Sequence, residues 1–116
     1  MSTQRPTVSF ENFNDGIVSI HEIDDDGNAG KIYGKFRYGE RTVGAVRYYE
    51  AMTAKVQIDR LIRIPYQRWI TTEYLAVLEG KVYEIRQVQM IQDTLPKTNA
   101  LSLHLARQRE VTDGVI

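Results

Sequence analysis

The histidines and carboxylates are the residues of this chain that could hold a metal ion or move a proton. There are two histidines, His21 and His104, and each lies in a stretch predicted to be a β-strand. The usual catalytic zinc site takes three protein ligands, so two histidines would need a carboxylate partner, and the chain has no His-Glu-x-x-His spacing. A lone histidine in a strand is more often a surface residue, or a residue whose hydrogen bonds are satisfied, than a ligand. We therefore expect no metal site.

The acidic run that begins at Asp24 has the first part of a calcium-binding pattern. Asp24, Asp26 and Asn28 match the first three ligand positions of an EF-hand loop. The sixth position, which needs glycine, is Ala29, and the twelfth, which needs a bidentate glutamate, is Lys35. The run is therefore predicted to be a simple turn, because Asp, Asn and Gly tolerate turn conformations.

Other catalytic chemistry has little support in the sequence. Cysteine is absent, which excludes a thiol nucleophile and a thiolate metal site. There is no glycine-rich phosphate loop and no Gly-x-Ser-x-Gly elbow. The paired carboxylates of a glycosidase stay compatible with the sequence, but a small β-domain offers no deep cleft to raise the pKa of one of them. We predict a protein that is not an enzyme and needs no cofactor.

Composition and charge place these residues in one globular domain. Of the 116 residues, 42% are hydrophobic and 26% are charged, and the formal net charge is zero. No apolar run approaches the ~18 residues that span a membrane, so we expect a soluble protein without a membrane partner. Residues 1–30 hold six acids and one base, whereas residues 31–68 hold nine bases and three acids. This segregation predicts either ordinary solvated faces or a bipolar surface suited to head-to-tail packing of identical subunits.

Alternation of apolar and polar residues predicts an all-β fold, a small antiparallel β-barrel or sandwich. Residues 1–15 are expected to form an N-terminal arm, residues 16–107 the barrel domain, and residues 108–116 a polar, frayed C-terminal tail. Residues 39–55 fit neither period well and are expected to form one long loop, with room for a short helix. About six strands are expected, at residues 16–24, 31–38, 56–65, 74–78, 81–89 and 101–105.

The strand pattern also predicts which side chains face the barrel interior. In the third predicted strand, Arg60 shares the face of Ile62 and Ile64. The residues expected to lie mostly inside are Val56, Ile58, Ile62, Ile64, Val82, Val88, Leu101, Leu103 and Leu105.

Aromatic and basic residues alternate in the middle of the chain. One interpretation is a core of strand aromatics with charges facing water. The alternative is an OB-like module that binds single-stranded nucleic acid, stacking bases on aromatic rings and following phosphates with cations. The aromatic residues concerned are Tyr33, Phe36, Tyr38, Tyr48 and Tyr49, and the basic ones are Lys31, Lys35, Arg37, Arg41 and Arg47.

Several short pieces of the chain follow one another at a characteristic spacing: RTVG (41–44), RYYEA (47–51), DRLIRIPY (59–66), YLAVLEGKVYEI (74–85) and LSL (101–103). In this order they resemble the head–tail joining proteins of long-tailed bacteriophages, also called head-closure or stopper proteins. The resemblance covers roughly residues 15–107, and the order of the pieces carries it because no single motif is diagnostic.

The resemblance implies a structural virion protein of the head–tail connector. Such proteins look like small β-barrels that form a homo-oligomeric ring under the portal and its adaptor, close the DNA channel after packaging and offer a docking surface to the tail. The expected location is the virion, and the host cytoplasm before assembly. Residues 39–55 occupy the place of the family's channel loop and are expected to be less ordered than the barrel in the free protein. The expected DNA-proximal residues are Arg41, Arg47, Tyr48, Tyr49 and Lys55, with non-specific contact to double-stranded DNA.

Overall fold

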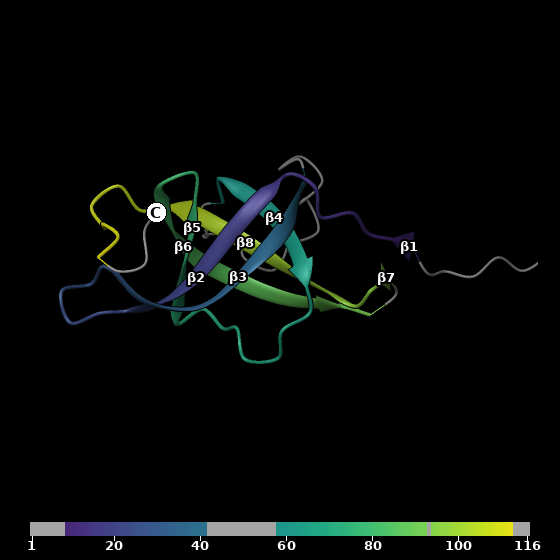
Figure 1. Cartoon of the computed structure of the whole chain (residues 1–116), viewed down its shortest axis with the longest axis horizontal. Helices are drawn as coiled ribbons and strands as arrows, with labels where there is room; N and C mark the ends of the chain where they lie inside the picture. Colours follow the sequence, from purple (N-terminus) through teal and green to yellow (C-terminus); the bar gives the residue numbers. More distant parts are fainter. Residues whose placement is uncertain (1–8, 42–57, 93, 113–116) are drawn as a thin grey trace, which may run out of the picture.

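The computed structural model describes residues 9–41, 58–92 and 94–112, and in this part of the chain it is an all-β protein without helices. Eight strands are labelled in sequence order in Figure 1. Their bounds are β1 Ser9–Phe10, β2 Gly16–Ile23, β3 Ala29–Arg41, β4 Arg60–Pro65, β5 Tyr74–Leu78, β6 Lys81–Ile91, β7 Thr94–Leu95 and β8 Thr98–Leu105.

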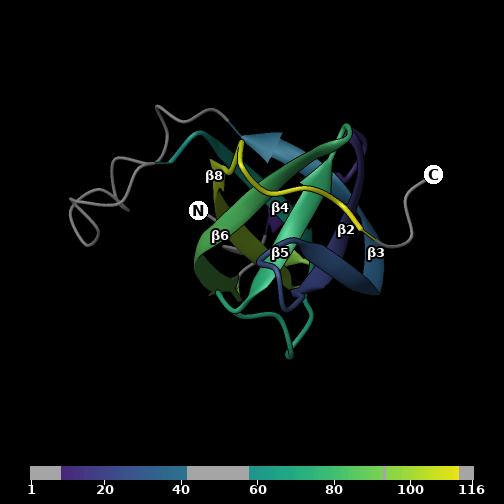
Figure 2. The same ribbon diagram turned by 90° about the vertical axis from the view of Figure 1, so that its left-hand side faces the viewer.

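Six of the strands form a closed barrel, which confirms the predicted fold class. The order around the barrel is β2-β3-β4-β8-β6-β5, and every neighbouring pair is antiparallel. The last strand in sequence, β8, therefore lies between β4 and β6, as the view along the barrel shows (Figure 2). Each of the six predicted strands has its counterpart among these six. The predicted start of the long loop was wrong, because residues 39–41 continue β3 and pair with β4.

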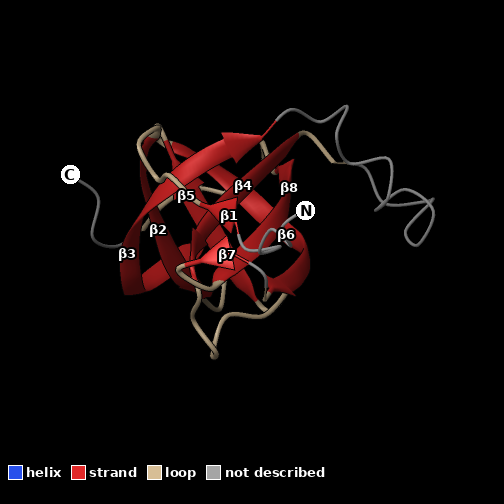
Figure 3. Ribbon diagram, turned by 90° about the vertical axis from the view of Figure 1, so that its right-hand side faces the viewer, coloured by secondary structure: helices blue, strands red, loops and turns tan. Residues whose placement is uncertain are grey.

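A second, very small sheet lies outside the barrel. Strands β1 and β7 pair in parallel, with Ser9 opposite Thr94 and Phe10 opposite Leu95 (Figure 3). The backbone N–H of Glu11 donates to the Leu95 carbonyl at 3.3 Å. The last part of the N-terminal arm is therefore attached to the barrel.

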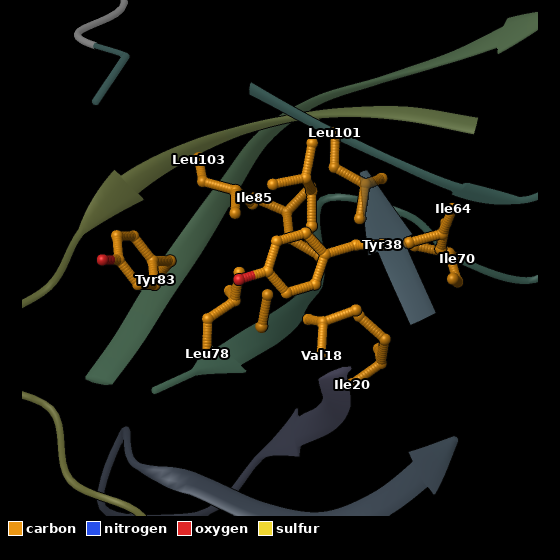
Figure 4. Close-up of a cluster of buried hydrophobic side chains, with 12 residues drawn as sticks. Val18, Ile20, Tyr38, Ile64, Ile70, Leu78, Tyr83, Ile85, Leu101 and Leu103 are labelled. Atoms are coloured by element: carbon orange, nitrogen blue, oxygen red, sulfur yellow. The ribbon is translucent and has the colours of Figure 1, made fainter. Parts of the chain in front are cut away.

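The barrel interior is filled by side chains from all six strands (Figure 4). Their alternation follows the period of two that a pleated strand imposes. The buried members of this cluster are Val18, Ile20, Tyr38, Ile62, Ile64, Ile70, Ala76, Leu78, Tyr83, Ile85, Leu101 and Leu103.

Most of the predicted interior residues are confirmed. Ile62, Ile64, Leu101 and Leu103 are fully buried in the barrel core. Val88 and Leu105 are half-buried at the margins of the core. The prediction was wrong for Ile58, which is half-buried on the outer face against Leu61 and Ala100. Strand β4 begins only at Arg60, so the alternation of the strand does not extend back to Ile58. Val56 lies outside the described residues.

The prediction was wrong for the facing of the first half of β6. The pairing of β6 with β8 shifts between Ile85 and Gln87, where a β-bulge interrupts the alternation. Tyr83 and Ile85 consequently point into the barrel, whereas Val82 is buried on the outer face. A bulge reverses the facing of every residue on one side of it, so strict alternation through residues 81–89 assigned Val82 to the wrong side.

The outer face over Val82 is covered by residues 106–112, which we call the C-terminal strap. Val111 packs on a small cluster of Ala29, Leu75 and Val82. The Ala29 N–H donates to the Glu110 carbonyl at 2.8 Å, and the Thr112 N–H donates to the Ala29 carbonyl at 2.8 Å. The expectation of a frayed tail is therefore wrong for residues 108–112.

Candidate functional site

The barrel has two ends that differ in structure. At one end β3 stops, β4 begins and the β5–β6 hairpin turns through Glu79 and Gly80; we call it the loop-root end, because residues 42–57 connect β3 to β4 there. Of the predicted DNA-proximal residues, the structure describes only Arg41. Arg47, Tyr48, Tyr49 and Lys55 lie outside the described residues.

Arg41, the last residue of β3, is held by an ion pair. Its Nη2 donates to Glu11 Oε1 at 2.5 Å, and the other carboxylate oxygen of Glu11 accepts from Arg63 Nη1 at 2.7 Å. The Glu11 side chain is only 5% exposed. Because each oxygen of the carboxylate binds a different guanidinium, Glu11 fixes both arginines at once.

The register of β3 on β4 explains why these two arginines meet. Gly39 pairs with Arg63 and Arg41 pairs with Leu61, so Arg41 and Arg63 project from the same outer face. The N-terminal segment crosses this face directly over Gly39: a Cβ there would lie 2.4 Å from the Asn12 carbonyl oxygen. The glycine thus makes room for the segment that delivers Glu11.

Arg60, the first residue of β4, closes the loop-root end from inside. It donates to Glu40 through Nη2 at 2.6 Å and Nε at 2.9 Å. It also donates to the Tyr83 hydroxyl at 3.1 Å, the Tyr38 hydroxyl at 3.4 Å and Glu79 Oε1 at 3.4 Å. Its guanidinium carbon lies 5.4 Å from the ring centre of Tyr83. One cation therefore joins β3, β4, β6 and the β5–β6 turn.

The electrostatics keep this cluster charged. Hydrogen bonding to the Glu40 carboxylate raises the pKa of Arg60, and this outweighs the opposite effect of burial. Burial raises the pKa of Tyr38, so its hydroxyl is neutral at pH 7. Arg60 thus carries a permanent positive charge that is compensated by an acid on the strand leading into residues 42–57.

Taken together, these contacts suit positioning rather than catalysis. Glu40 precedes residues 42–57 by two positions and Arg60 follows them by three, so the ion pair between them ties the two roots of that connection together. Sequence reasoning placed Arg60 on the inner face through alternation. It missed Glu11, Glu40 and Arg63, because a single acid in a polar arm or at a strand end carries no signal in the sequence.

The two histidines have different surroundings. His21 is buried, with Nδ1 2.7 Å from the Gly30 carbonyl and Nε2 2.8 Å from the Ser19 hydroxyl. His104 Nδ1 lies 2.9 Å from Asp59 Oδ2 without hydrogen-bond alignment. Among the described residues, no three His, Asp or Glu side chains gather as a metal site would require.

The Asp24 carboxylate is occupied by hydrogen bonds from its own turn and from Thr112. Asp24 Oδ1 accepts from the backbone N–H groups of Asp26 and Asn28, both at 2.9 Å, and its Oδ2 accepts from the Thr112 hydroxyl at 2.9 Å. These hydrogen bonds, led by the one from Asn28, lower the pKa of Asp24. The carboxylate therefore closes its own turn and anchors the C-terminal strap.

The opposite end of the barrel is closed by aromatic rings, and we call it the aromatic end. Trp69, from the loop after β4, lies 5.4 Å from Tyr74 and 6.2 Å from both Tyr33 and Phe36, measured between ring centroids. Phe36 is half-buried against the core, and Tyr38 is buried within it. Of the three described aromatics that an OB-like module would use, only Tyr33 is largely exposed, at 45%.

The segregation of charge along the sequence does not carry over in full to the folded surface. Glu11, an acid of the first thirty residues, pairs with Arg41 and Arg63 from the basic stretch. Arg60 is paired with Glu40. Folding therefore neutralises part of both charge clusters within one chain.

A cavity of about 640 Å³ lies between the β5–β6 hairpin and the C-terminal strap. Its apolar wall includes Val77, Val82 and Val111, and its polar rim includes Lys81 and Arg109. Arg109 also donates to Glu84 at 3.0 Å and to the Gly27 carbonyl. The C-terminal strap forms one wall of this cavity. The residues that line it do not form a recognisable group of catalytic side chains.

The chain matches none of the known protein-family models and none of the curated proteins with which it was compared. In the part of the chain that the structure describes, no helix could cross a bilayer. Any functional assignment therefore depends on the barrel, on the contacts at its loop-root end and on the sequence resemblance.

Proposed function

We propose that this chain is a structural protein of a bacteriophage head–tail connector. It would assemble as a homo-oligomeric ring between a portal or adaptor ring and the tail proteins, and close the DNA channel after packaging. The observation that carries the proposal is the ion-paired root of residues 42–57. In the family that the chain resembles, a long loop at this place crosses the channel.

The physical demands of a channel plug agree with the contacts at this end. A loop that crosses a lumen must be anchored on a scaffold that does not yield when DNA presses on it. The barrel supplies that scaffold, and the Glu40–Arg60 and Glu11–Arg41 pairs fix the two strands that carry the loop. A net charge of zero limits repulsion when many copies pack side by side.

The decisive experiment removes the gene from the phage genome that carries it and examines the particles by electron microscopy. The expected result is heads that package DNA but lose it, and that stay tailless. Complementation with the full chain should restore tailed particles. A variant shortened by several residues within 44–54 should still fold into the barrel. Particles complemented with this variant should fail to retain their DNA. Normal tailed particles without the gene would overturn the proposal.

A titration with DNA separates this proposal from a nucleic-acid-binding module. A stopper subunit should bind a single-stranded oligonucleotide weakly as a free monomer. Sub-micromolar binding with a steep dependence on salt would instead favour the OB-like module, because released counterions set that dependence.

A further inference from the structure

Most of strand β3 is paired on one side only. On its β2 side the ladder runs from Ala29 to Tyr38. On the opposite side it pairs with β4 at three positions, Gly39, Glu40 and Arg41. Among the described residues, the stretch from Lys31 to Arg37 therefore has a second edge with no partner strand.

Pro65 explains why the β3–β4 ladder stops. With Gly39 opposite Arg63, the same register would set Arg37 opposite Pro65. Proline has no N–H to donate, and β4 ends at this residue. The following loop closes the interior with Trp69 against Phe36 in place of a strand.

The N–H and C=O groups that point away from β2 belong to residues whose side chains are exposed and positively charged. The Tyr38 carbonyl accepts from the Asp15 N–H on the β2 side at 2.9 Å. Because successive residues of a strand direct their N–H and C=O groups to alternate sides, those of Arg37 and Lys35 point to the unpaired side. The side chains of Lys31, Lys35 and Arg37 are exposed, and none has an ion-pair partner among the described residues.

We infer that the edge of β3 from Lys31 to Arg37 is a strand-addition site for an extended acidic segment of a partner protein. Such a segment would pair its backbone with the N–H and C=O groups of Lys35 and Arg37. Carboxylates at alternate positions would then face the cationic side chains. This site lies on the barrel wall, and the proposal does not depend on how residues 42–57 act.

Charge and geometry select this partner over two others. Pairing of two copies through the same edge would oppose the cations of one chain to those of the other, which is the device by which natural edge strands avoid self-association. DNA would meet the cations but could not satisfy main-chain donors and acceptors in register. An acidic extended peptide satisfies both.

The test uses the full-length chain and an end-blocked octapeptide of alternating glutamate and valine. Amide NMR shifts should change in a saturable way at residues 33–37, with a Kd below about 1 mM. The same peptide with N-methyl groups at alternate residues keeps its charge and loses its strand hydrogen bonds, so it should not bind. A Lys35→Glu/Arg37→Glu variant should weaken binding at least tenfold. Lys81→Glu, an exposed charge reversal at the start of β6, should leave it unchanged.

Three results would overturn the inference. The first is no binding of the alternating peptide, with the wild-type chain shown to be folded by its amide spectrum. The second is equal binding of the N-methylated peptide, which would mean simple charge attraction. The third is a 20-base-pair DNA duplex that shifts the same amides more strongly than the peptide does.

Discussion

The two ends of the barrel are closed by different chemistry. At the loop-root end, Arg60 is held by carboxylates and tyrosine hydroxyl groups through directional bonds. At the aromatic end, Trp69 packs edge to face against Tyr33 and Tyr74, and the described residues there form no comparable set of ion pairs. Ion pairs and hydrogen bonds fix geometry, whereas ring packing excludes water and tolerates small shifts.

The difference matches what each end has to hold. The loop-root end holds the last residue of β3 and the first residue of β4, which flank residues 42–57 on either side. The aromatic end only has to seal the barrel beyond Pro65, where β3 and β4 no longer pair. Disturbing each end separately should therefore give distinguishable results.

The largest loss of stability is expected for substitutions in the barrel core, which lies between the two ends. Ile62→Ala or Leu103→Ala should lower the free energy of unfolding by about 2–5 kcal/mol, because both side chains are fully buried and a cavity would remain. Urea unfolding followed by circular dichroism measures this loss. A loss below 1 kcal/mol for both variants would mean that the core is not packed as described.

Trp69→Ala should come next, with a loss of about 2–4 kcal/mol, since the side chain is large but only half-buried. Trp69→Phe keeps one ring and should lose less than half as much. Neither loss should depend on salt, because no charge pair is broken. Urea unfolding at two salt concentrations checks this, and a salt-dependent loss would show that the aromatic end also depends on ion pairs.

Arg60→Ala should lower stability by about 1–2 kcal/mol, because Glu40 is partly exposed and water can solvate it once the arginine is gone. The chain has a single tryptophan, Trp69, so its fluorescence reports on the aromatic end alone. That emission should stay unchanged in folded Arg60→Ala. A shifted emission maximum would show that the two ends are coupled.

The smallest effect concerns two tyrosines whose pKa values are raised for different reasons. Burial raises the pKa of Tyr38, and a hydrogen bond to Glu22 raises that of Tyr33. Glu22→Gln should therefore lower the pKa of Tyr33 and leave that of Tyr38 in place, as ultraviolet titration would show. Equal shifts of both would contradict separate causes.

The raised pKa of Tyr38 also predicts how the free energy of unfolding changes at alkaline pH. The neutral form of Tyr38 is favoured in the folded state, so its contribution is complete below about pH 10 and declines as the pH rises above that value. Alkaline unfolding of Tyr38→Phe should begin at higher pH than that of the wild-type chain. An earlier onset would mean that the hydroxyl bond to Arg60 outweighs burial.

Alternation along the sequence was enough to predict the six barrel strands, and it placed Arg60 among inward residues. It failed where the period itself changes, at the bulge after Ile85, because nothing in the sequence there marks an extra residue. The C-terminal strap was missed for another reason. Residues 107–112 are mostly polar. A segment held by hydrogen bonds, by the ion pair of Arg109 with Glu84 and by a single valine has no hydrophobic pattern.

The candidate site was predictable only in outline. Long-range pairs such as Glu11 with Arg63 join residues 52 positions apart, and residue types alone do not define such partners. Arg41 was expected to face DNA; in the structure its charge is shared with Glu11. Glu11 became recognisable only when strand register brought the two arginines to one face.

The position of β8 between β4 and β6 has a consequence for how the chain reaches this fold. Until residues 98–105 are in place, β4 and β6 each keep an open edge, so no sub-barrel can close early. Closure must wait for residues 98–105, and topologies dominated by such distant pairings fold in milliseconds to seconds, not microseconds. A chain that ends before Thr98 would expose the unpaired edges of β4 and β6 to other molecules. We expect it to aggregate and not to remain as a smaller folded unit.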